Sequence, residues 1–175
     1  MKKITVLLAD DHTIVREGFR KILELEKDLE VIGEAQDGRA AITQARKLRP
    51  DVVLMDIAMP LLNGLEATRQ LLKALPDTKV LMLSAHSDDA YVQNATESGA
   101  VGFLLKQTSA QDVCRAIRDV AAGKTFFSPS ISKRQGHLHP PSLCRNGVAN
   151  KKIAQLTSRE MEVLQLIAEG KANKE

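Results

Sequence analysis

Short runs of apolar residues recur along the first 105 residues of the chain, with more polar segments between them. The run at 52–55 contains only valine, leucine and methionine, as in a strand that is buried on both faces of a parallel sheet. The pattern predicts five strands in all, at residues 3–9, 30–35, 52–55, 79–83 and 101–105.

The segments between these runs have apolar residues at the three- and four-residue spacing of amphipathic helices. In the last of them, Ser109 and Asp112 have the spacing of a helix N-cap and its third helical residue. We expect five helices, at residues 12–26, 39–48, 64–75, 88–98 and from 110 onward. Because strands alternate with helices, we predict an α/β fold with a flavodoxin-like, doubly wound, five-stranded parallel sheet in the order 2-1-3-4-5.

The periodicity is lost after residue 124, where proline, glycine, serine and asparagine become frequent. This composition is typical of a linker, which we place at residues 125–152. Helical signals return near the end, where Thr157 and Glu160 have the spacing of a capping box. The sequence thus predicts a first domain at residues 1–124, a linker, and an incomplete helical domain at residues 153–175.

The amino-acid composition limits the classes of protein to which this chain can belong. With 43% apolar and 27% charged residues the chain is of the ordinary globular kind, and no apolar run reaches the roughly 18 residues that a membrane span requires. We therefore expect a cytoplasmic protein with no membrane partner and with free cysteine thiols. Residues 126–175 contain 8 basic and 4 acidic residues, which permits a nucleic-acid partner for this segment.

Polar side chains follow four of the predicted strands, and they are Asp10 and Asp11, Asp56, Ser84, and Lys106. Because the carboxyl ends of parallel strands meet at one edge of a sheet, we expect these side chains to lie together. Three carboxylates repel one another unless a cation is present, and Mg²⁺ prefers such oxygen ligands. A lysine and a hydroxyl group suit a phosphoryl group. The set therefore predicts that Asp56 attacks phosphorus and forms an aspartyl phosphate.

Other interpretations of these residues stay open at this stage. The acidic pair could instead cap the helix that follows it. His12 is interpreted as a loop or first-turn residue rather than a metal ligand. His137, His139 and Cys144 lie in the predicted linker, and their spacing matches no zinc pattern.

Four motifs identify a family. They are Leu-Leu-Ala-Asp-Asp-His at 7–12, Leu-Met-Asp-Ile-Ala-Met-Pro-Leu-Leu-Asn-Gly at 54–64, Ser-Ala-His at 84–86 and Gly-Ala-Val-Gly-Phe-Leu-Leu-Lys at 99–106. With these motifs the chain resembles, over about residues 3–123, the receiver domain of bacterial two-component response regulators of the NarL/FixJ type. The resemblance implies that Asp56 is the phosphoacceptor and that Ser84 and Lys106 contact the phosphoryl group. The magnesium ligands it implies are Asp10, Asp11, Asp56 and the backbone carbonyl of Ala58.

The resemblance also implies a switch and two protein partners. Phosphorylation is expected to draw Ser84 toward the phosphoryl group and to let Phe103, at the position of the family's switch aromatic, turn inward. Alternatively, Phe103 is a plain core residue. The expected partners are a sensor histidine kinase, which supplies the phosphoryl group, and a second copy of the domain, which forms a homodimer.

The end of the chain resembles a second family. Residues 156–164 and 167–175 are similar to the opening of a LuxR-type helix-turn-helix domain, which implies DNA binding and transcription regulation. Such a domain reads bases with its second helix, and this chain stops before one, so we do not expect specific DNA binding by this chain alone.

The leading hypothesis is a response regulator that is no enzyme beyond its own phosphorylation and dephosphorylation. The alternatives are a DNA-independent, phosphorylation-controlled interaction module and an aspartyl-phosphate phosphohydrolase. Phosphohydrolases of that kind usually need an aspartate as general acid two residues after the nucleophile, and here this position is Ala58.

Overall fold

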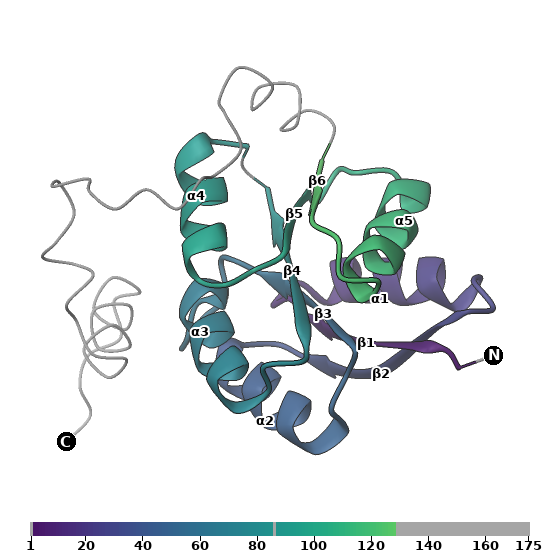
Figure 1. Cartoon of the computed structure of the whole chain (residues 1–175), viewed down its shortest axis with the longest axis horizontal. Coiled ribbons are helices and arrows are strands. Elements are labelled where there is room, and N and C mark those ends of the chain that lie inside the picture. Colours follow the sequence, from purple (N-terminus) through teal and green to yellow (C-terminus); the bar gives the residue numbers. More distant parts are fainter. Residues whose placement is uncertain (1, 86, 129–175) are drawn as a thin grey trace, which may run out of the picture.

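The computed structural model describes residues 2–85 and 87–128, which form three layers (Figure 1). The middle layer is a parallel sheet of six strands: β1 (Ile4–Ala9), β2 (Leu29–Ala35), β3 (Val52–Asp56), β4 (Lys79–Ser84), β5 (Gly102–Leu105) and β6 (Phe126–Phe127). Helices α1 (Thr13–Glu24) and α5 (Ala110–Ala121) cover one face of the sheet. The other face is covered by α2 (Gly38–Leu48), α3 (Gly64–Ala74) and α4 (Asp89–Glu97).

The strand order is β2-β1-β3-β4-β5-β6, so the predicted doubly wound order of the first five strands is confirmed. The predicted number of strands is too low by one. Strand β6 pairs with β5 and begins within the segment that the sequence analysis assigned to the linker. It was missed because two residues, Phe126 and Phe127, are too few to show a period. Hydrogen bonds hold the segment in place: Ser128 N donates to the Phe103 carbonyl at 3.0 Å, and Ser128 Oγ accepts from Leu105 N at 3.1 Å.

The sheet separates two apolar cores, because alternate residues of its central strands point to opposite faces. Val53 and Met55 of β3 face α2, α3 and α4, whereas Val52 and Leu54 face α1 and α5. All four side chains are fully buried. This two-sided burial explains why the strand has no polar residue before its end, and it holds the first polar residue, Asp56, at the edge of the sheet.

The loop from β3 to α3 folds back against the end of its own strand. Gly64 N donates to the Ile57 carbonyl at 3.0 Å, and the Asn63 side chain caps α3 by accepting from Glu66 N at 2.9 Å. A Cβ atom at position 64 would overlap the Asp56 carbonyl oxygen. Only glycine permits this approach, which keeps the loop close to Asp56.

Some sequence predictions lie outside the described residues. They concern His137, His139, Cys144 and the helical segment at 153–175, and the domain boundaries likewise stay predictions. Within the described part of the chain, Cys114 is a buried free thiol, as expected. None of the helices at residues 2–85 and 87–128 is long and apolar enough to cross a membrane.

Candidate functional site

The carboxyl ends of β1, β3 and β5 bring three charged side chains together. Strand β1 is hydrogen-bonded to β3 with Ala9 opposite Met55, so the next residues, Asp10 and Asp56, are neighbours across the sheet. Lys106 follows β5 directly, and its backbone N–H donates to the Ser84 carbonyl at 2.8 Å. The strand ends thus bring Asp10, Asp56 and Lys106 together, and the roles predicted for them stay predictions.

Lys106 joins the two buried carboxylates. Its Nζ atom lies 2.8 Å from Asp56 Oδ2 and 2.7 Å from Asp10 Oδ2. Both aspartate side chains are 2% exposed, and the lysine side chain is 18% exposed. Carboxylates removed from water in this way are costly unless a cation pairs with them. A single ammonium group faces two negative charges here, so the site retains an excess of negative charge.

The pKa shifts follow from this imbalance. Burial raises the pKa of Asp56, and although the hydrogen bond from Lys106 opposes that shift, the nearby charge of Asp10 adds to it. Burial lowers the pKa of Lys106, but its close contacts with the carboxylates of Asp10 and Asp56 outweigh burial and raise it overall. The lysine is therefore held as a cation, while ionised Asp56 is less favourable in the fold than in water.

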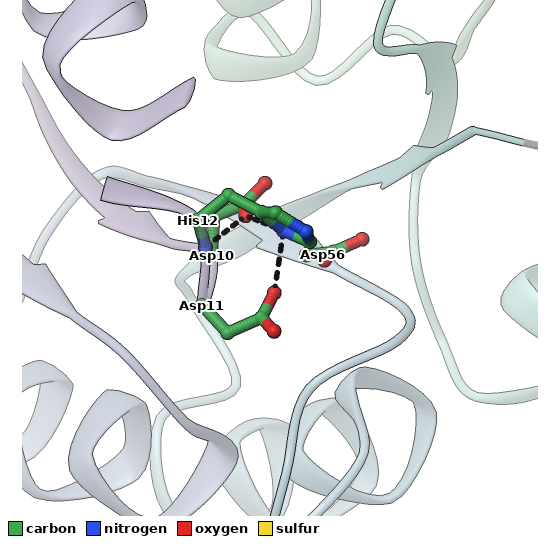
Figure 2. Close-up of side chains that lie close together, drawn as sticks. All are labelled: Asp10, Asp11, His12 and Asp56. Carbon is green, nitrogen blue, oxygen red and sulfur yellow. Dashed lines mark hydrogen bonds and ion pairs between the residues drawn. The ribbon is translucent and has the colours of Figure 1, made fainter. Parts of the chain in front are cut away.

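Asp11 and His12 complete an acidic cluster (Figure 2). Asp10 Oδ1 accepts a hydrogen bond from His12 N at 2.8 Å, and His12 Nδ1 lies 3.1 Å from Asp10 Oδ1 and 2.8 Å from Asp11 Oδ1. One ligand atom from each of Asp10, Asp11, His12 and Asp56 lies within 4.8 Å of the others. The sequence favours a loop or first-turn role for His12 over a metal ligand, yet its ring lies beside the carboxylates of this cluster. The one sequence signal was its place directly after the acidic pair.

The residues present fit a small divalent cation. Asp10 Oδ2 is buried, and although Lys106 Nζ is close to it, the oxygen accepts no well-aligned hydrogen bond within the described residues. Three carboxylates with one lysine provide the hard oxygen ligands and the unbalanced negative charge that Mg²⁺ requires. An acidic pocket suited to Mg²⁺ is therefore present, and the individual ligands stay predictions.

The other predicted site residues lie around this cluster. Ser84, the last residue of β4, is 3% exposed. Ala58 is exposed, and its backbone N–H donates to the Asp56 carboxylate, while the predicted role of its carbonyl stays a prediction. Phe103 is fully buried among Met82 and other apolar residues beneath α4, so its ring occupies the inward position in this structure.

The chain matches the models of two protein families. Residues 6–118, more than half of the chain, match the model described as the response regulator receiver domain. The chain belongs to the response regulator family. Residues 154–175 of this response regulator match the model for bacterial regulatory proteins of the luxR family, which confirms the predicted second similarity.

Individual relatives of this response regulator agree with that assignment. It is 41% identical to the response regulator protein VraR of Staphylococcus aureus, over 98% of this chain and 79% of VraR. It is 38% identical to the transcriptional regulatory protein DegU of Brevibacillus brevis, over 98% and 78% of the two chains. Among solved structures, the signal receiver domain of the putative response regulator NarL from Mycobacterium tuberculosis has a TM-score of 0.68 and 37% identity, over 71% of this chain and 100% of that one. The NarL/FixJ type is thereby confirmed, as is a role in transcriptional signalling.

Replacing Asp56 with asparagine is expected to stabilise this response regulator at neutral pH when divalent cations are absent. Because burial raises the pKa of Asp56 above its unfolded-state value, keeping the carboxylate ionised costs folding free energy at neutral pH. The cost falls away as pH drops through the raised pKa toward the unfolded-state value. The advantage of Asp56→Asn should therefore shrink between about pH 7 and about pH 4. Thermal unfolding of both proteins in the presence of a chelator measures the difference in stability. A difference that grows on acidification would contradict the raised pKa of Asp56.

Proposed function

We propose that this response regulator accepts a phosphoryl group on Asp56 from the phosphohistidine of a sensor histidine kinase. The observation that supports this most is the position of Lys106, whose Nζ lies within 2.8 Å of a carboxylate oxygen of both Asp56 and Asp10. An ammonium group in this place can contact an oxygen of a phosphoryl group on Asp56 and offset its charge.

The proposed step is a direct transfer between the kinase and Asp56. A carboxylate oxygen of Asp56 forms a bond to phosphorus while the bond from phosphorus to the histidine nitrogen breaks, and the electron pair of that bond stays on the imidazole ring. Lys106 and the Ala58 backbone N–H orient the carboxylate. A magnesium ion held by Asp10, Asp11, Asp56 and the Ala58 carbonyl would supply positive charge toward the phosphoryl oxygens when bound.

The proposed readout uses the residues beside the phosphorylated carboxylate. Ser84 ends β4, the strand next to β3, and we expect its hydroxyl to move toward a phosphoryl oxygen on Asp56. Strand β4 also pairs with β5, and Met82 lies opposite Phe103. A shift of β4 would therefore displace the buried Phe103 ring and α4, which packs in the same apolar core. We propose that this change favours a homodimer in the cytoplasm. The luxR-family match at residues 154–175 implies DNA binding for the family, but this segment alone is not expected to read DNA specifically.

Incubation of the full chain with acetyl phosphate and Mg²⁺ tests the phosphorylation step. We expect one phosphoryl group per chain by intact mass spectrometry, none in Asp56→Asn, and none when a chelator removes the metal. Asp77→Asn is the matched control, because Asp77 is exposed and lies in the turn after α3. Equal phosphorylation of Asp56→Asn and the unchanged chain would refute the proposed acceptor.

The same incubation separates signalling from the phosphohydrolase hypothesis. A phosphohydrolase would release inorganic phosphate many times per chain, because a general acid and base would act in each cycle. The side chain at position 58 is a methyl group, which cannot do this. We therefore expect a slow decay of one stored phosphoryl group, and continuous release of phosphate at a high rate would favour the enzyme instead.

A further inference from the structure

Arg16 reaches from α1 to the backbone that presents the acidic pair. Its Nη1 atom donates to the Asp10 carbonyl at 2.6 Å, and its Nη2 atom lies 3.3 Å from Thr13 Oγ1. The arginine side chain is only 12% exposed. A guanidinium group this well covered has few free orientations, so the contact with Asp10 is maintained rather than occasional.

Glu34 of β2 fixes the guanidinium group from the other side. Arg16 Nε donates to Glu34 Oε2 at 3.1 Å, and Arg20 Nε donates to Glu34 Oε1 at 2.6 Å. Burial opposes ionisation of Glu34, but the hydrogen bonds from Arg20 and Arg16 outweigh burial and lower its pKa. The carboxylate therefore stays charged at neutral pH and orients both arginines, of which Arg16 donates to the Asp10 backbone and Arg20 donates to Glu34 and Glu24.

The Asp10 residue is thereby held through both of its backbone polar groups. Asp10 N donates to the Ala35 carbonyl at 3.1 Å, and Asp10 O accepts from Arg16. The peptide that follows leads to Asp11, whose exposed position gives its carboxylate little packing. Building on the proposed function, we propose that Arg16 is a positioning residue of the phosphorylation site: it fixes the Asp10–Asp11 peptide and so the direction of both carboxylates toward the cation.

The charge of Arg16 would by itself have the opposite effect. A cation near a Mg²⁺ site repels the metal, so its removal should tighten metal binding if Arg16 acted only through its charge. Loss of positioning instead weakens binding, because groups that orient metal ligands typically contribute about 10–100-fold in metal affinity. The direction of the change thus separates positioning from bulk electrostatics.

The test compares Arg16→Gln with Arg20→Gln in the full chain. Arg20 shares Glu34 with Arg16 and lies on the same helix, so its variant loses a similar ion pair without touching the Asp10 backbone. Calorimetric titration with Mg²⁺ alone, without a phosphodonor, is expected to give a Kd about 10-fold higher or more for Arg16→Gln. Arg20→Gln should stay within about 2-fold of the unchanged chain, and Arg16→Lys should lie between the two, because an ammonium group supplies only one of the bonds.

Each outcome of these titrations either supports or overturns the positioning role of Arg16. Equal or tighter Mg²⁺ binding by Arg16→Gln, or an equal loss in both glutamine variants, would overturn the positioning role while leaving the proposed function intact. If the unchanged chain neither binds Mg²⁺ nor becomes phosphorylated, the proposed function fails as well. Thermal unfolding of both variants serves as the folding check. Should Arg16→Gln not fold, the Mg²⁺ affinity of Arg16→Lys decides in its place, and an affinity equal to that of the unchanged chain would overturn the role.

Discussion

Replacing Lys106 with glutamine is expected to lower the free energy of unfolding by about 2–4 kcal/mol at neutral pH in a metal-free buffer. The amide occupies a similar volume, but the carboxylates of Asp10 and Asp56 then face each other, both 2% exposed, without the cation that joins them. Phosphorylation by acetyl phosphate should also slow by about 100-fold, because a preorganised donor to the phosphoryl group is lost. Denaturant unfolding and mass spectrometry measure the two effects.

Two conditions should reverse the loss of stability without restoring the reaction. Loss of the Lys106 cation raises the pKa of Asp56 further, and acidification protonates this carboxylate. The cost of keeping it ionised falls away as pH drops through the raised pKa toward the unfolded-state value, so the deficit of Lys106→Gln should shrink. Saturating Mg²⁺ should have the same effect, because removal of the competing ammonium group lets the folded variant bind the metal more tightly than the unchanged chain does. The matched control is Lys3→Gln, which removes the exposed ion pair between Lys3 Nζ and Glu30 Oε2, 3.9 Å apart. This variant should change the free energy of unfolding by less than about 1 kcal/mol. A deficit that neither acid nor Mg²⁺ reduces would contradict the assigned role of Lys106.

Replacing Gly64 with alanine is the second large effect we expect. The added Cβ would overlap the Asp56 carbonyl oxygen, and that atom belongs to a strand that cannot easily move. Overpacking of this kind should destabilise the fold by about 3 kcal/mol. Because Asp56 itself is displaced, phosphorylation should slow by about 10–100-fold as well, since small misplacements of reacting groups are costly.

Gly18→Ala is the matched control for this prediction. Gly18 lies within α1, and a Cβ at that position meets no atom within 4 Å. Alanine favours the helix, so this variant should gain up to about 1 kcal/mol and keep its phosphorylation rate. Chemical denaturation of both variants checks the sign. If Gly64→Ala were as stable as Gly18→Ala, the close approach of the loop to the strand would be wrong.

The gathering of Asp10, Asp56 and Lys106 could be predicted because these residues obey a one-dimensional rule. Each one follows an apolar run, and the parallel sheet converts the end of a run into a place on one edge. The position of Asp56 beside Asp10 then follows from the pairing of β1 with β3, which the alternation of strands and helices predicted. Predicting the positions of these side chains required no knowledge of their contacts with residues that are distant in the sequence.

Arg16 and His12 could not be predicted in this way. The orientation of Arg16 depends on Glu34, which lies 18 positions away on β2. The ring of His12 lies beside the acidic pair because His12 is the extended N-cap residue of α1, with φ −85° and ψ 108°. Periodicity shows which face of a helix or strand a residue occupies, but it does not show which residue of another element it contacts there.

The short strand β6 also affects how this domain meets other molecules. Without it, β5 would be the last strand of the sheet and would offer a row of free backbone donors and acceptors to any extended chain in solution. Two residues of β6 and the Ser128 contacts occupy that row, and what remains at the border is too short to template further strand addition. At this border of the sheet, β6 thereby limits edge-to-edge strand pairing with very little additional sequence.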